Sequence, residues 1–248
     1  GGSLNLFHHP IAQVREIADE VGAKVLFDAA HLCGMIAGKV WPQPLEEGAH
    51  LMTFSTYKSL GGPAGGLIVT NDDAIAQKLD AIAYPGLTAN FDAAKTAALG
   101  ITLQDWKTVG PAFAQMMVQT SQALAQNLQN RGVNIYASDR GFTTSHQFAI
   151  LAAPYGGGQR AAKRMGEAGL LACGIGLPIA PVDGDLNGLR IGTPEIVRLG
   201  MKVEHMDQLA DFIARSLDLS NDAHLIQREI TEWRKQFIGV HYTVDLPN

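Results

Sequence analysis

The segment Ser55-Thr-Tyr-Lys-Ser-Leu-Gly-Gly-Pro-Ala-Gly-Gly66 places one lysine, Lys58, between two apolar runs at residues 51–54 and 67–70. Both runs have the composition of half-buried strands. The glycines after the lysine permit a tight turn and a close approach of the backbone to a ligand. The pattern predicts a turn that presents a lysine amine at the end of a strand. A surface lysine in an ordinary glycine-rich hairpin turn would give the same pattern.

A second strand-like run, residues 23–28, precedes this segment and ends in the carboxylate Asp28. A loop of small residues that contains His31 follows it. Strands that alternate with helices in the first half of the chain predict an α/β sandwich with a parallel-rich sheet. Ligands bind such sheets at the carboxyl ends of the strands. We therefore expect Asp28 and the Lys58 turn to meet at one cleft.

Periodicity and capping residues predict the other elements. Pro10 is expected to open a helix that Gly22 ends, Asn71 or Asp72 to cap a second, and Ser220 to cap the last. The predicted helices cover residues 11–21, 73–79, 92–131 with a break near Gly110-Pro111, 159–168, 204–217 and 221–237, and further strands cover residues 50–56, 133–136, 147–152 and 189–192. We expect two domains, residues 1–115 and 116–248.

Composition limits the class of protein. The 248 residues are 46% hydrophobic and 17% charged with a net charge of -5, which suits a globular protein and argues against a nucleic-acid partner. No apolar segment approaches the ~20 residues that span a bilayer, and we expect no membrane association. No histidine or cysteine cluster has the spacing of a metal site. Cys33 and Cys173 stand far apart and indicate free thiols, which predicts a cytoplasmic protein.

These residue types together suit one cofactor. Pyridoxal phosphate needs a lysine amine, a carboxylate for its pyridine nitrogen, and hydroxyl and N–H donors for its phosphate. An arginine in an apolar strand, here Arg190, suits a substrate carboxylate because burying a guanidinium is costly unless it is paired. Singly, Asp28 could be a turn cap, His31 a loop histidine and Arg190 part of a structural ion pair. The ordered set favours the cofactor site.

Three segments, Phe27–Ala37, Ser55–Gly66 and Leu189–Pro194, together resemble the serine hydroxymethyltransferase family. The resemblance extends to about residue 217. It implies the aspartate-aminotransferase-like fold of pyridoxal-phosphate enzymes. The first predicted domain would be the C-terminal part of the large cofactor-binding domain, and the second a small α+β domain. It also implies an enzyme that acts on the Cα–Cβ bond of small β-hydroxy amino acids.

The resemblance also implies roles for individual residues. Lys58 would be the lysine that holds the cofactor covalently, and Asp28 would pair with its pyridine nitrogen. His31 would lie near the cofactor ring and its phenolic oxygen. Arg190 would bind the carboxylate of the amino acid.

At other positions the sequence agrees with the family pattern only in part. Ser3 resembles a family serine near the cofactor, and Ser55 falls where a phosphate contact is expected. Tyr57 stands where the family usually has histidine, and Ala64 where it has arginine. The segment 172–178 lacks the asparagine expected before its proline, near the folate in the family. The resemblance implies tetrahydrofolate as a second cofactor, and this last departure argues against it.

Three functions follow. The first is a serine/glycine hydroxymethyltransferase. The second is a folate-independent enzyme of the threonine-aldolase or transaldolase kind. The third is a catalytically silent assembly subunit. Family members carry a long segment before the position of residue 1, so we expect a fragment, a processed product or one half of a split enzyme. We expect a homodimer, or association with a chain that supplies that segment.

Overall fold

The computed structural model describes residues 2–244, which form two compact units. The first unit runs to Ala114 and includes Thr243 and Val244, and the second comprises Gln115–Tyr242. The division falls inside helix α5 (Gly110–Asn130).

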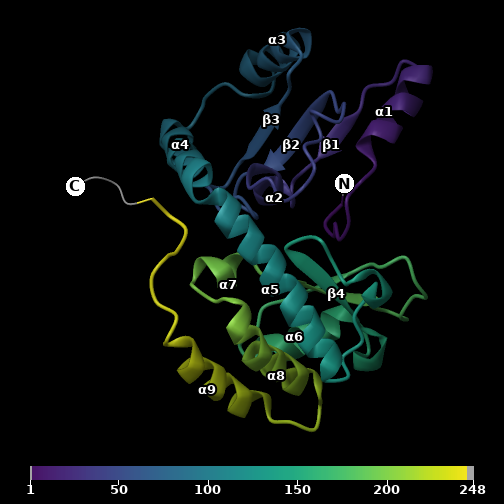
Figure 1. Ribbon diagram of the computed structural model, residues 1–248, viewed down its shortest axis with the longest axis vertical. Helices are drawn as coiled ribbons and strands as arrows, with labels where there is room; N and C mark the ends of the chain where they lie inside the picture. The colour runs from purple at the N-terminus through teal and green to yellow at the C-terminus, as the bar shows by residue number, and fades with distance from the viewer. Residues whose placement is uncertain (1, 245–248) are drawn as a thin grey trace. The chain divides into compact units, whose positions relative to one another are not determined.

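The first unit alternates helices and short strands (Figure 1). Its elements are α1 (Ile11–Glu20), β1 (Leu26–Asp28), α2 (Cys33–Ala37), β2 (Leu51–Ser55), β3 (Gly66–Val69), α3 (Asp73–Ala81), the π-helical turn η1 (Ile82–Leu87), α4 (Ala93–Thr108) and the start of α5. Local signals set several boundaries. Asp72 caps α3 by accepting hydrogen bonds from the N–H groups of Ala74 and Ile75, which have no partner within the helix. The predicted helix break near Gly110 is confirmed by the separate helices α4 and α5.

The three strands of this unit form one sheet in the order β1-β2-β3. β1 and β2 are parallel, with Asp28 opposite Thr53, whereas β2 and β3 are antiparallel. β1 is shorter than the predicted run of residues 23–28. Just before it, the N–H of Val25 donates to the His50 side chain and the carbonyl of Val25 accepts from the His50 N–H, both at 2.9 Å. The parallel pair brings the carboxyl ends of β1 and β2 to the same edge.

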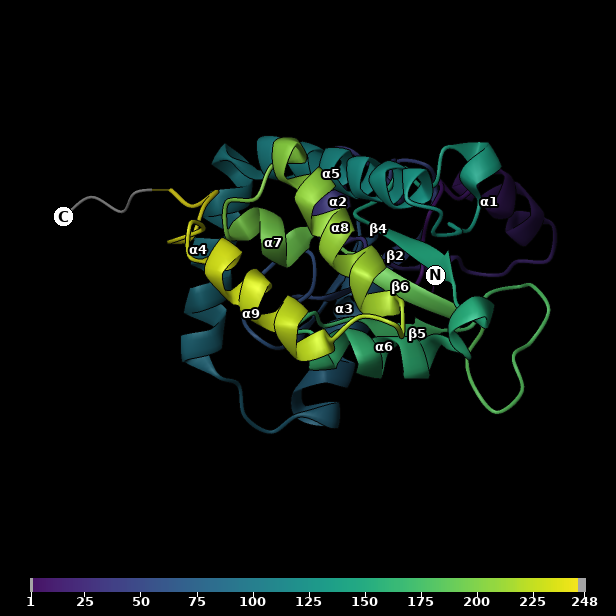
Figure 2. The same ribbon diagram turned by 90° about the horizontal axis from the view of Figure 1, so that it is seen from below.

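The second unit packs helices against an antiparallel sheet in the order β4-β6-β5 (Figure 2). Its elements are the rest of α5, η2 (Ser138–Arg140), β4 (Gln147–Leu151), η3 (Ala153–Tyr155), α6 (Gly158–Glu167), β5 (Cys173–Ile175), β6 (Gly188–Gly192), α7 (Pro194–Arg198), η4 (Val203–His205), α8 (Met206–Leu217) and α9 (Ala223–Arg234). Phe148, Ile150 and Leu189 are fully buried at the centre of its core. This unit is an α+β arrangement.

Two predictions for the second unit were wrong, and one strand was missed. The strand expected over residues 133–136 is reduced to one bridge, between Ile135 and Ile150, and the chain leaves it at Ala137, which has a left-handed φ of 56°. The short strand β5 carried no local signal and was missed. Ser220 does not cap the last helix. Asp222 does, by accepting from the N–H of His224 at 2.9 Å.

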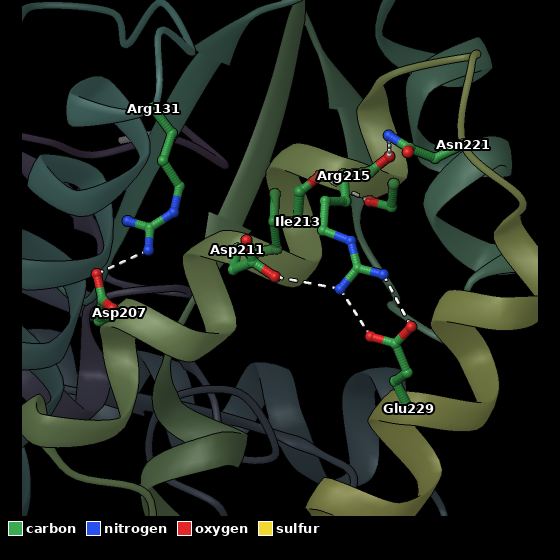
Figure 3. Close-up of polar contacts among 8 residues, drawn as sticks. Arg131, Asp207, Asp211, Ile213, Arg215, Asn221 and Glu229 are labelled. Atoms are coloured by element: carbon green, nitrogen blue, oxygen red, sulfur yellow. Dashed lines mark hydrogen bonds and ion pairs between the residues drawn. The ribbon is translucent and has the colours of Figure 1, made fainter.

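An ion-pair cluster joins α8 to α9 (Figure 3). Both terminal nitrogens of Arg215 reach the two carboxylate oxygens of Glu229, at 2.7 and 2.9 Å, and one also lies 3.2 Å from Asp211. The carbonyl of Arg215 accepts from the Asn221 side chain at 3.1 Å. The paired guanidinium lowers the pKa of Glu229 below its ordinary value.

At pH 7 and low salt, Arg215→Met should lower the free energy of unfolding by about 0.5–1 kcal/mol. This value lies in the upper part of the range for exposed ion pairs, because the contact between Arg215 and Glu229 is bidentate. Since the folded pKa of Glu229 is depressed, this stabilisation is present above the ordinary carboxyl pKa and disappears as pH falls through the folded value. Urea unfolding at pH 7 and in acid measures it, with Lys235→Met, which breaks the far more exposed pair with Glu232, as the control. An equal loss in acid would contradict this account.

Candidate active site

Two of the predicted site residues end adjacent parallel strands. Asp28 is the last residue of β1 and Ser55 the last residue of β2. His31 follows β1 within the next loop, and Lys58 follows β2 in the turn toward β3. The first unit therefore carries a carboxylate, an imidazole, an amine and a hydroxyl on the two segments that leave one sheet edge. The pairing of β1 with β2 is what gathers them.

The carboxylate of Asp28 is half-buried and held in orientation. Its Oδ1 accepts a hydrogen bond from the N–H of Ala30 at 2.9 Å. The N–H of Ala29 donates to the Thr53 carbonyl at 2.9 Å, which continues the pairing with β2 past the end of β1. The side chain at the strand end is thus fixed by the backbone that follows it.

The turn that carries Lys58 is closed by backbone hydrogen bonds. The N–H of Gly61 donates to the Lys58 carbonyl at 2.8 Å, and that of Gly62 to the Thr56 carbonyl at 2.8 Å. Gly61 has a φ of +67°, which a residue with a side chain rarely adopts. Lys58 is half-buried, and its Nζ lies 5.9 Å from the centroid of the exposed Tyr57 ring. The turn presents the amine next to an aromatic face.

The other predicted residues lie in different surroundings. Ser55 and His31 are half-buried within the two segments already described. Ser3 is exposed in the segment before α1. Arg190 belongs to the second unit, in β6, opposite Ala149 of β4 and Cys173 of β5. The approach of Ser3 and Arg190 to the Asp28 edge therefore stays a prediction.

The segment 172–178, which departs from the family pattern, contains strand β5 and the apolar loop that follows it at residues 176–178. Leu177, which precedes Pro178, is buried, and its side chain lies against Gly188. The Asn187 side chain accepts from the Leu177 N–H at 2.7 Å and donates to its carbonyl at 3.0 Å. An aliphatic side chain thus occupies the position where the family has an amide.

Sequence reasoning missed two residues that hold the Lys58 turn. Ser59 is buried, and its hydroxyl bonds to the loop that carries His31. Trp106 of α4 is also buried, and its Nε1 donates to the Leu60 carbonyl at 2.7 Å. A hydroxyl next to a candidate lysine was a signal available for Ser59. Nothing local connects Trp106 to a turn so far away in the sequence.

The donor set of the sheet edge fits pyridoxal phosphate. Its ring nitrogen needs a carboxylate, its aldehyde an amine, and its phosphate hydroxyl and N–H donors. Asp28, Lys58 and Ser55 supply these three types from adjacent strand ends.

Within residues 2–244, no group of three or more histidine, cysteine or acidic side chains is placed to hold a metal ion. Every helix in that range is too short or too polar to cross a bilayer.

Comparisons with known proteins agree with this reading of the fold. The chain is 64% identical to an α-methylserine aldolase of Variovorax paradoxus over 98% of its length, and 39% identical to a serine hydroxymethyltransferase of Sulfolobus acidocaldarius, also over 98%. It spans 55% and 57% of the length of these two proteins.

A crystal structure of L-threonine transaldolase from Pseudomonas fluorescens superimposes with a TM-score of 0.88 at 23% identity, over 97% of this chain and 55% of that one. This likeness confirms the predicted fold class. The family model for serine hydroxymethyltransferase matches residues 6–213. The chain therefore belongs to the serine hydroxymethyltransferase family.

Proposed function

We propose that the protein containing this chain is a pyridoxal-phosphate aldolase that cleaves the Cα–Cβ bond of α-methylserine or a similar β-hydroxy amino acid without folate. The observation that carries the proposal is the placement of Asp28 and Lys58 at the carboxyl ends of adjacent parallel strands. The 64% identity to an α-methylserine aldolase supports the choice of substrate.

Each residue of the proposed site would have a separate role. The cofactor, when bound, supplies an electron sink for the electron pair left on Cα when its bond to Cβ breaks. Lys58 would hold the cofactor through its amine. The oriented carboxylate of Asp28 would keep the pyridine nitrogen protonated. His31 would lie against the ring, and Ser55 and Ser3 would bind other parts of the cofactor.

The substrate's own chemistry limits which bond can react. In α-methylserine Cα carries no hydrogen, so proton loss from Cα cannot compete with cleavage. Arg190 would bind the carboxylate of the substrate. This contact would determine which of the remaining bonds to Cα is oriented for cleavage. Cleavage removes the proton of the β-hydroxyl and returns a proton to Cα. The products are formaldehyde and alanine, which balance the substrate.

The apolar loop at Leu177 supports the folate-independent reaction over a true hydroxymethyltransferase. A hydroxymethyltransferase stays the second candidate, because the chain is 39% identical to one such enzyme. The retention of Asp28, His31, Lys58 and Arg190 together argues against a silent assembly subunit.

The test uses the full-length gene product loaded with pyridoxal phosphate. We expect formaldehyde and alanine from α-methylserine at equal rates with and without tetrahydrofolate. Serine should give little glycine under either condition. Glycine formation from serine that requires tetrahydrofolate, with α-methylserine inert, would instead identify a hydroxymethyltransferase. Absence of cofactor absorbance in the purified protein would reject both enzymes.

The wider assembly is part of the same proposal. Residues 1–115 would complete the large cofactor-binding domain and residues 116–248 would form the small domain. We propose a homodimer with a small amino acid as substrate, as the family resemblance implies, and a cytoplasmic location, which the two free cysteines favour.

A further inference from the structure

The hydroxyl of Ser59 joins the two segments that carry the candidate site residues. Ser59 directly follows Lys58 and is only 2% exposed. Its Oγ donates to the His31 carbonyl at 2.7 Å and accepts from the N–H of Gly34 at 2.9 Å. A hydroxyl can donate and accept at once, so this one side chain binds a carbonyl of the loop after β1 and an N–H of the first turn of α2.

The thiol of Cys33 extends this contact toward the end of β2. Its Sγ lies 3.3 Å from the Ser59 hydroxyl oxygen and 3.3 Å from the Ser55 carbonyl oxygen. Burial raises the pKa of the Cys33 thiol, which therefore keeps its proton and can donate it to the Ser55 carbonyl. The contact thus connects positions on both sides of Lys58 to the start of α2.

Close packing of the two backbones makes these hydrogen bonds possible. A Cβ added at Gly34 would collide with the Ser59 carbonyl, so only glycine allows the start of α2 to come this near the turn. From another side, Trp106 Nε1 donates to the carbonyl of Leu60. The backbone on the carboxyl side of Lys58 is therefore held by the side-chain hydrogen bonds of two buried residues, Ser59 and Trp106.

We propose that Ser59 is a positioning residue, whose hydroxyl sets the Lys58 amine in register with Asp28 and His31 so that the amine meets the aldehyde of pyridoxal phosphate. The proposal rests on the proposed function for the identity of the cofactor. A serine that served stability alone would affect unfolding without affecting the rate at which Lys58 captures the aldehyde.

The test compares Ser59→Thr with Ser59→Val in the full-length protein. Threonine and valine have nearly the same shape and differ in the hydroxyl. After removal of the cofactor, the rate of reloading with pyridoxal phosphate is followed by its visible absorbance. We expect the Thr variant to reload within about 3-fold of the parent and the Val variant about 10–100-fold more slowly, the scale of a misplacement near 1 Å.

Ser216→Ala is the matched control for stability. Ser216 is a fully buried serine of the second unit that donates one hydrogen bond, to the Ile213 carbonyl at 2.7 Å. Its loss should lower the melting temperature of the protein without slowing reloading. Equal reloading rates for the Thr and Val variants, or an equally slow Ser216→Ala protein, would overturn the positioning role.

A thiol measurement tests the loop contact without the cofactor. In a Cys173→Ser background, Cys33 is the remaining cysteine of the chain, and its rate of reaction with Ellman's reagent reports how tightly the loop packs on the turn. We expect faster reaction in the Val variant than in the Thr variant; full protection in both would overturn the contact. If the parent protein binds no pyridoxal phosphate, the proposed function fails, while the thiol rates still decide whether the Ser59 hydroxyl joins the segments.

Discussion

Lys58→Ala should abolish the borohydride-stable attachment of pyridoxal phosphate to the full-length protein. Only a primary amine at this position can form that attachment, and the glycine-rich turn presents this amine beside the end of β2. Cleavage of α-methylserine should fall by about 10²–10⁴-fold or more, the scale of losing a group that transfers protons in the reaction, which Lys58 would do beside the cofactor. Mass analysis of the reduced protein and a formaldehyde assay measure the two effects.

Lys78→Ala provides the matched control for this substitution. Lys78 is an exposed lysine near the end of α3 in the same unit. Its removal should leave both the adduct and the activity unchanged. Lys58→Arg should keep the positive charge but lose the adduct, which separates covalent capture from electrostatics. An undiminished adduct in Lys58→Ala would show that another amine holds the cofactor.

Asp28→Asn should leave cofactor binding largely intact but lower kcat by about 10²–10³-fold, the scale of losing one preorganised electrostatic contact. An asparagine Oδ1 can still accept the hydrogen bond from the Ala30 N–H, so the loop after β1 should keep its shape. The substitution removes the negative charge that would keep the pyridine nitrogen protonated. Steady-state cleavage and the absorbance of bound cofactor separate the two effects.

Asp73→Asn, at the exposed first turn of α3, tests whether loss of any carboxylate has this effect, and we expect no change from it. Asp28→Ala should also lose the hydrogen bond from Ala30 and destabilise the protein in addition. An Asp28→Asn protein with the parent's kcat would mean that the carboxylate does not face the ring nitrogen.

Local sequence signals were sufficient to predict a helix boundary where the deciding residue acts on the backbone next to it. Asp72 caps α3 within its first turn, and the chain breaks between α4 and α5 beside Gly110. The strand β5 could not be found in this way. Cys173–Ile175 has no alternation or turn signal, and it becomes a strand only because β6 offers hydrogen-bond partners along its edge.

Some residues of the proposed site could likewise be placed from local sequence signals, whereas others could not. Asp28 and Lys58 could be placed at strand ends because each strand has an apolar run and each is followed by turn residues. That these two ends are neighbours depends on the parallel pairing of β1 with β2. Trp106 could not be assigned to the Lys58 turn, because it reaches the Leu60 carbonyl from a separate helix.

The amino-acid sequence alone was enough to place an amine, a carboxylate and an imidazole next to short strands, because side-chain chemistry and local backbone preferences depend on nearby residues. The tertiary structure alone revealed the neighbouring strand ends and the buried Ser59 hydroxyl that joins the His31 loop to the Lys58 turn. The reason is physical: hydrogen bonds between segments distant in the chain form only after the backbone has folded, and no short pattern records which buried group will meet which partner.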